Sequence, residues 1–120
     1  ALEVELFVCV DQDHFRSDVR RAVLEVLSSG TRSDGTLGFF HPDRYTFGTP
    51  VYLSAIVAAA QAVPGVESVR VQSFRRQREP LSSALDTGVL VMGRLEIARL
   101  DNDPNFPEHG VLDLTMGGGK

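Results

Sequence analysis

With 120 residues, of which 42% are hydrophobic and 23% are charged, the chain has the size and composition of one ordinary globular domain. Its formal net charge of -4 at pH 7 argues against a general nucleic-acid binder and against a membrane-surface protein. Cys9 is the only cysteine, and no apolar run reaches the ~18–20 residues that span a bilayer, so an internal disulfide, a cysteine-based zinc site and a transmembrane helix are excluded.

The chain begins with the patterns of a strand and a helix. Aliphatic residues occupy every second position over 2–10, which is the period of a strand. Asp11 and Asp13 are expected to cap the next helix, because their carboxylates can accept hydrogen bonds from first-turn N–H groups. Apolar residues then recur at helical spacing over 15–27, which predicts an amphipathic helix that ends at Ser28-Ser29-Gly30.

A polar loop and an aromatic segment follow this helix. Residues 31–38 (TRSDGTLG) are rich in turn-forming residues, which predicts a surface loop. Residues 39–48 carry several aromatic rings but show the period of neither a helix nor a strand. We expect an ordered irregular segment whose rings pack against the domain or against another protein.

A second helix is expected next, and its start has two candidates. Thr49 could be the N-cap, with Pro50 in the first helical turn, where its missing N–H costs nothing. Ser54 is the rival N-cap, and in that case residues 51–53 are extended. The Pro64-Gly65 sequence is expected to end the helix in both cases.

The last part of the chain is expected to consist mainly of strands. Alternating patterns predict three of them, over residues 66–71, 94–100 and 112–116. Leu95 and Ile97 are expected to share one face of the second of these strands. The Pro-, Asn- and Asp-rich residues 101–110 predict a loop. The last two strands are therefore expected to form an antiparallel hairpin around this long loop.

The order of elements predicts the fold class. Helices come early and strands come late, which favours an α+β fold: a two-layer sandwich with two helices packed on one face of a mostly antiparallel sheet of three to four strands. The opposite sheet face would carry Glu3, Glu5 and Glu96, together with Phe7 and Cys9, and would be partly wet and partly covered. We expect one domain over residues 1–120. Because the chain lacks an initiator Met and starts inside a strand, we expect it to be a domain cut from a longer polypeptide.

The strongest candidate for a metal site is the segment Asp101-Asn102-Asp103-Pro104-Asn105. It places oxygen-bearing side chains at every second position, as calcium-binding loops do. An EF-hand loop would also need Gly at its sixth and Glu at its twelfth position, where this chain has Phe106 and Leu112. The simpler interpretation is that these side chains cap turns through bonds to the backbone.

The remaining reactive residue types do not form a catalytic pattern. His14, His41 and His109 have no second ligand at a helical metal-binding spacing. Cys9 lies among aliphatic residues with no neighbouring cation, so it is expected to be a buried small hydrophobe. No serine has the glycine spacing of a nucleophile elbow. We therefore predict no catalytic, metal-binding or cofactor-binding residue and no enzymatic activity.

A basic run leaves two interpretations open. Arg70, Arg75, Arg76 and Arg78 surround Phe74 within nine residues. Arginine and aromatic residues are enriched at the energetic centres of protein interfaces, where guanidinium groups pair with acidic partners. The alternative is a solvated loop.

Three long segments resemble one protein family. Residues 38–48 (GFFHPDRYTFG), 52–66 (YLSAIVAAAQAVPGV) and 92–104 (MGRLEIARLDNDP) resemble, in the same order, the C-terminal region of baseplate J-like baseplate assembly proteins. This family belongs to contractile phage tails and to phage-tail-like injection systems. The resemblance extends over nearly all of the chain, and its motifs are long and unusual in composition.

The resemblance implies a structural role as the last domain of a longer baseplate protein. Such proteins resemble wedge components that surround a central hub and link it to the sheath. The implied partners are other wedge, hub and sheath subunits or copies of the same chain, with no nucleic acid, membrane or cofactor. The implied location is the cytoplasm during assembly and then the tail or tail-like particle.

Two functional hypotheses follow from these observations. The first is an interaction module of a baseplate wedge, whose contact surface would consist of exposed rings and adjoining arginines: Phe39, Phe40, Tyr45, Phe47, Arg75, Arg76 and Arg78. The second is a small-ligand-binding regulatory α+β domain, in which the Pro64-Gly65 turn and neighbouring loops hold a metabolite. A pocket lined by a few converging polar groups would favour the second hypothesis.

Overall fold

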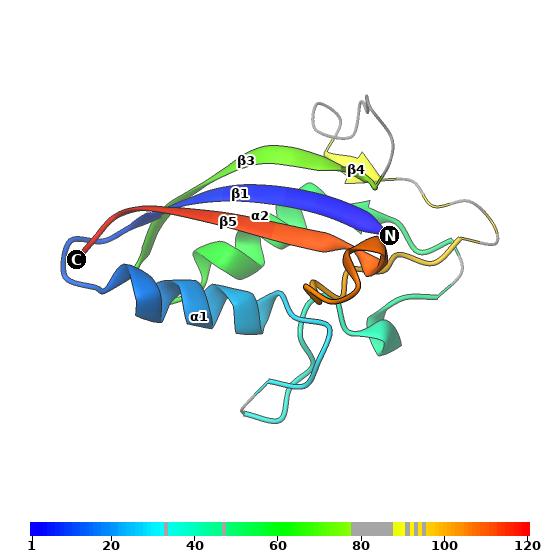
Figure 1. Cartoon of the computed structure of the whole chain (residues 1–120), viewed down its shortest axis with the longest axis horizontal. Coiled ribbons are helices and arrows are strands. Elements are labelled where there is room, and N and C mark those ends of the chain that lie inside the picture. Colours follow the sequence, from blue (N-terminus) through cyan, green and yellow to red (C-terminus); the bar gives the residue numbers. More distant parts are fainter. Residues whose placement is uncertain (33, 47, 78–87, 91, 93, 95) are drawn as a thin grey trace.

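The fold is that of a computed structural model, which describes residues 1–32, 34–46, 48–77, 88–90, 92, 94 and 96–120. Seven helices and strands follow one another along these residues (Figure 1): β1 (Leu2–Val10), α1 (Arg16–Val26), β2 (Val51–Tyr52), α2 (Leu53–Gln61), β3 (Val66–Arg76), β4 (Val89–Leu90) and β5 (Val111–Gly118). The same residues include two short 3-10 turns, at Pro42–Arg44 and Pro107–His109. None of the helices described is long and apolar enough to cross a membrane.

The main sheet has the strand order β3-β1-β5, so the first strand of the chain lies at its centre. β1 is antiparallel to β3 and parallel to β5. Both helices lie on the same side of this sheet (Figure 1). β2 and β4 form a separate antiparallel pair. The predicted α+β class is confirmed: two helices accompany sheets whose strand pairs are mostly antiparallel.

The alternation along β1 divides the sheet into a core face and an open face. Every second side chain of β1 is almost completely buried, with exposed fractions of 0–2%: Leu2, Val4, Leu6, Val8 and Val10. Val19 and Val23 of α1 and Ile56 and Ala60 of α2 complete the core from the helical layer. Each large aliphatic side chain contributes roughly 1.5–3 kcal/mol by leaving water, so this layer supplies much of the stability of the fold.

An irregularity in β3 brings more apolar residues to the core face. Val71 lies opposite Leu6 and Phe74 lies opposite Val4, with a register shift between the two pairs. Residues three positions apart would face opposite sides of a regular strand. The extra residue of the bulge corrects this mismatch, so Phe74 enters the core with an exposed fraction of 2%.

The predicted hairpin between residues 94–100 and 112–116 is wrong. β5 pairs with β1, and residues 96–100 form no strand, although the Leu2 N–H donates to the Arg99 carbonyl at 2.9 Å. The buried phase of this segment also differs from the prediction, because Leu100 is 1% exposed whereas Ile97 is 43% exposed. Leu95 lies outside the described residues. An alternating segment offers two possible faces, and here the contact with the start of β1 buries the face that carries Leu100.

Both predicted helix starts also need correction. α1 begins after Phe15, which makes no side-chain cap, and Asp11 instead accepts a hydrogen bond from the Asp13 N–H at 2.8 Å. Its carboxylate therefore closes the turn before the helix. α2 begins at Leu53, so neither Thr49 nor Ser54 is its N-cap. The rival expectation of an extended segment is confirmed in part, since Val51–Tyr52 is a strand.

Candidate interaction surfaces

The aromatic segment packs inward. Phe40 is only 3% exposed, with its ring centroid 4.9 Å from that of Phe39 in an edge-on contact and 6.2 Å from that of Tyr45 in a stacked one. Burial raises the pKa of Tyr45 to about 12, although the nearby charge of Arg44 opposes this shift. The prediction that the ring of Phe40 is exposed is therefore wrong, because Phe40 belongs to the core. Phe39 and Tyr45 are half-buried, and Phe47 lies outside the described residues.

The predicted arginine cluster is divided between the two faces of the sheet. Arg75 lies opposite Glu3, and its Nη2 donates to Glu3 Oε1 at 2.7 Å on the open face. Arg76 lies opposite the buried residue Leu2, and its guanidinium donates two 2.9 Å bonds to the carboxylate of Glu96. Consecutive strand residues point to opposite faces, so adjacent arginines cannot form one patch. The predicted open-face position of Glu96 is therefore wrong.

The expected single contact surface is thus not assembled by the described residues. Arg78 lies outside them, and the remaining members occupy the core, its rim and both faces of the sheet. A contact role for Phe39, Tyr45, Arg75 and Arg76 stays a prediction. Sequence composition could not distinguish aromatic rings that pack against each other within the chain from rings that are exposed for contact with another protein.

The segment from Asp101 to Asn105 uses its oxygen atoms for contacts within the chain. Asp101 accepts hydrogen bonds from Arg99 at 2.8 and 3.0 Å, and this contact raises the pKa of Arg99. Asn102 accepts from the Leu112 N–H at 3.0 Å, and Asp103 accepts from the Asn105 N–H at 2.9 Å. These bonds match the turn-capping interpretation. Across the part of the chain that the structure describes, no group of three His, Cys, Asp or Glu side chains could hold a metal ion.

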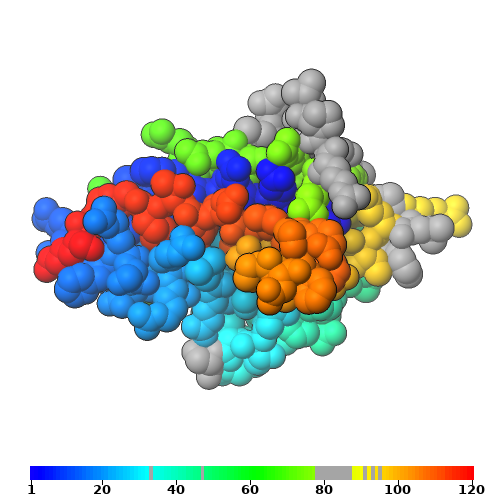
Figure 2. Space-filling view, viewed as in Figure 1, coloured from blue at the N-terminus to red at the C-terminus, as the bar shows by residue number. Residues whose placement is uncertain are grey.

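The open face of the main sheet is a further candidate surface. Residues of β1 point to it between residues of both neighbouring strands, so that Glu5 lies opposite Ser73 and Asp113, and Phe7 lies opposite Arg70 and Thr115. Both helices lie on the other side of the sheet. Figure 2 shows atoms of β1 at the molecular surface between those of β3 and β5. The strand pattern predicted that Glu3, Glu5 and Phe7 share a face, but only the pairing shows what lies beside them.

One end of this open face is apolar. A Cβ atom added to Gly117 would lie 2.6 Å from the Phe7 ring, so the ring packs directly against the glycine backbone. Cys9 lies opposite Gly117 and is only half-buried. The prediction of a buried core cysteine is therefore wrong, because Cys9 takes the phase of Phe7 and not that of the aliphatic residues. The open face consequently changes from charged to apolar along β1.

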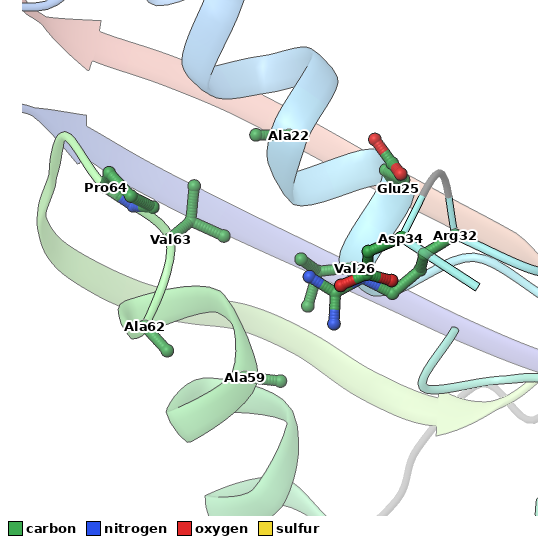
Figure 3. A pocket seen from close by; sticks show the side chains of 9 residues that line it. All are labelled: Ala22, Glu25, Val26, Arg32, Asp34, Ala59, Ala62, Val63 and Pro64. Carbon is green, nitrogen blue, oxygen red and sulfur yellow. The ribbon is translucent and has the colours of Figure 1, made fainter. Parts of the chain in front are cut away.

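A pocket of about 340 Å³ lies between the two helices (Figure 3). Its walls are mostly small and apolar, with polar groups on the side of the loop: Ala22, Glu25, Val26, Arg32, Asp34, Ala59, Ala62, Val63 and Pro64. The Nε atom of Arg32 is buried without a hydrogen-bond partner among the described residues. Asp34 accepts bonds from the Thr36 N–H and hydroxyl, which lower the pKa of its carboxyl group.

The open face and the pocket offer different chemical groups. The open face offers carboxylates, an exposed guanidinium and an aromatic ring, and the pocket offers an apolar hollow with charges at its rim. Comparisons of the chain with protein-family models, with curated proteins and with solved structures found no match.

Proposed function

We propose that this chain is a structural and assembly module of a baseplate wedge in a contractile phage tail or a phage-tail-like injection system. It acts through protein–protein contacts and not through catalysis. The single observation that carries the proposal is the open sheet face, which presents charged and aromatic side chains on the side away from both helices. A sheet with one covered and one open face suits a domain that lies against another polypeptide.

The segments that resemble baseplate proteins support the proposal as one structural unit. The Gly48 N–H donates to the Glu96 carbonyl at 2.9 Å, which joins the first segment to the third. Each segment also contributes to one core, as Phe40, Ile56 and Leu100 do with exposed fractions of 0–3%. The three segments therefore pack together in this chain, as segments of one structural unit would.

The proposal specifies partners and location. The partners are other wedge, hub and sheath subunits or further copies of the chain, and neither nucleic acid nor membrane takes part. The protein assembles in the cytoplasm and is then a component of the tail or tail-like particle. The net charge of -4 is compatible with partners that offer basic side chains.

Co-purification tests this function. The chain would be co-expressed with wedge, hub and sheath subunits of the same system, and we expect it to be recovered in a complex with at least one of them. Arg70→Glu, on the open face, should weaken recovery, whereas Arg21→Glu, on the exposed surface of α1, should not. Failure of the unmodified chain to join any of these subunits would refute the proposed function.

The interhelical pocket favours a second candidate, a small-ligand-binding regulatory domain. Pro64 lines it, as this hypothesis expects, and the charged groups of Arg32 and Asp34 lie at one side. A thermal-shift screen over metabolites and divalent ions would support this candidate if one compound gave a large saturable rise in Tm. Ala59→Leu, which would partly fill the pocket, should then abolish the rise.

A further inference from the structure

We infer that the open sheet face docks a segment of a neighbouring subunit that presents a basic side chain to Glu5 and Asp113 and an apolar side chain to Phe7. The inference rests on the proposed function, because it names the contact surface of the module and the chemistry of its partner. It is distinct from the predicted surface of aromatic rings, of which Phe40 lies in the core.

The first observation is a pair of acidic residues that are register partners and make no ion pair among the described residues. Glu5 and Asp113 are direct partners in the parallel register of β1 and β5. Ser73 lies on the other side of Glu5, and the nearby Arg75 already binds Glu3 at 2.7 Å. Within the part of the chain that the structure describes, neither carboxylate makes an ion pair or a side-chain hydrogen bond.

This arrangement favours a cationic group from outside the chain. Like charges directly opposite each other on neighbouring strands destabilise a sheet. A lysine or arginine placed between the two carboxylates would reverse this repulsion and gain two charge-assisted contacts. The acidic net charge of the chain would also accelerate the encounter with a basic partner.

The second observation concerns the residues beside this acidic pair. Phe7 is two residues along β1 from Glu5, and its ring lies close enough to Gly117 that a methyl group there would clash. This ring is half-buried and offers an apolar contact next to the charges. Arg70 lies opposite Phe7, is exposed and makes no ion pair within the described structure. The surface is therefore positive along β3 and negative toward β5, which fixes the orientation of a docked segment.

The β5 edge of the main sheet is partly occupied and is therefore less suitable for a partner strand. The Leu112 N–H of β5 donates to the Asn102 side chain at 3.0 Å, and the Leu114 carbonyl accepts from Arg20 at 3.1 Å. These two side chains occupy backbone groups that an added strand would need. On the open face, by contrast, Glu5, Asp113 and Arg70 make no ion pair within the described residues, so this face is the better docking surface.

The experiment uses the 120-residue chain and a defined probe. The probe is a short peptide of alternating arginine and valine with blocked ends, titrated into ¹⁵N-labelled protein while amide chemical shifts are recorded. We expect saturable shifts centred on Glu5, Phe7 and Asp113. A second acidic group formed by Asp11, Asp13 and Glu67 serves as the internal comparison, because non-specific attraction would shift both regions equally.

Matched variants separate a specific site from general charge. Glu5→Gln combined with Asp113→Asn should weaken peptide binding by about three- to tenfold, the effect of removing two exposed ion pairs. It should leave the thermal unfolding temperature unchanged or raise it, because the like-charge repulsion disappears. Asp13→Asn combined with Glu67→Gln changes the net charge equally and should leave binding unchanged.

Three results would overturn the inference. The first is that both double variants weaken peptide binding equally, and the second is that the amide chemical shifts centre on other residues. The third is a concentration-dependent dimer that the Glu5 and Asp113 changes dissociate, because this result would assign the face to a second copy of the chain. The outcome is separable from that of the proposed function. Peptide binding without co-purification would refute only the baseplate role, whereas co-purification that survives the Glu5 and Asp113 changes would refute only the docking face.

Discussion

Replacement of Phe40 by alanine tests whether the aromatic segment belongs to the core. The ring is 3% exposed and contacts the rings of Phe39 and Tyr45 at centroid distances of 4.9 and 6.2 Å. Deleting a buried phenyl ring removes its transfer free energy and leaves a cavity, which together cost about 3–5 kcal/mol. We therefore expect Phe40→Ala to lower the free energy of unfolding by roughly 4 kcal/mol.

Urea denaturation followed by circular dichroism would measure this loss. With a slope of about 2 kcal/mol per molar urea, typical of a small domain, the midpoint should fall by about 2 M. Such a loss is a large share of the ~5–15 kcal/mol that stabilises an ordinary domain. Phe40→Leu, which keeps most of the side-chain volume, should cost only about 1 kcal/mol and keeps the comparison measurable if the alanine variant is unfolded.

Phe106→Ala is the matched control, because it deletes the same group where the ring is 49% exposed and stacks on His109. Its effect should stay within about 0.5 kcal/mol. Equal midpoints for the two alanine variants would refute the placement of Phe40 in the core. The surface of exposed aromatic rings that the sequence predicts would then regain its support.

Three further predictions concern the backbone, the pH dependence and an ion pair. Gly110→Ala should destabilise the chain by about 2 kcal/mol, because Gly110 has φ 108° and an added Cβ would lie 2.7 Å from the Leu100 Cα. Thermal unfolding would measure this loss, and the control variant Gly30→Ala should be nearly neutral, because the space around Gly30 is open. The pKa of Tyr45 is about 12, above its ordinary value of 10.0, so this phenol ionises at a lower pH in the unfolded chain than in the folded one, and the free energy of unfolding should be unaffected below pH ~10 and fall as the pH rises from about 10 toward 12. Tyr45→Phe should flatten this part of a plot of stability against pH. An ultraviolet titration that shows a Tyr45 phenolate near pH 10 would contradict the placement of the ring. A double-mutant cycle on Arg76→Ala and Glu96→Ala should give a coupling free energy of about 1 kcal/mol, because the two side chains form a partly exposed ion pair with two hydrogen bonds. This coupling free energy should fall in high salt. A value of zero would show that the pair does not stabilise the fold.

Local patterns predicted the elements of this fold better than their pairing. The alternation over residues 2–10 predicted the central strand and its two faces, because one face is completely buried and the other is not. The apolar spacing over residues 15–27 likewise predicted α1. The partner of the last strand could not be predicted in this way. Its choice of β1 over residues 94–100 depends on contacts between opposite ends of the chain.

The candidate surface was predictable only in part for the same reason. The strand pattern by itself placed Glu3, Glu5 and Phe7 on one face. The carboxylate that lies beside Glu5 comes from Asp113, more than 100 residues later in the chain, and only the strand register brings the two together. The alternating pattern of residues 112–116 predicted a strand, but it gave no information about which other strand would pair with it.

The position of β1 has a consequence for biosynthesis. Among the strands of the main sheet, the central one is translated first, whereas β5, which covers one of its edges, is translated last. The sheet therefore cannot be completed until β5 has emerged from the ribosome, and loop closure across almost the whole domain must precede the final pairing. Until then, a strand of alternating aliphatic residues has an uncovered edge, so the domain is most exposed to aggregation in the interval between the synthesis of these two strands.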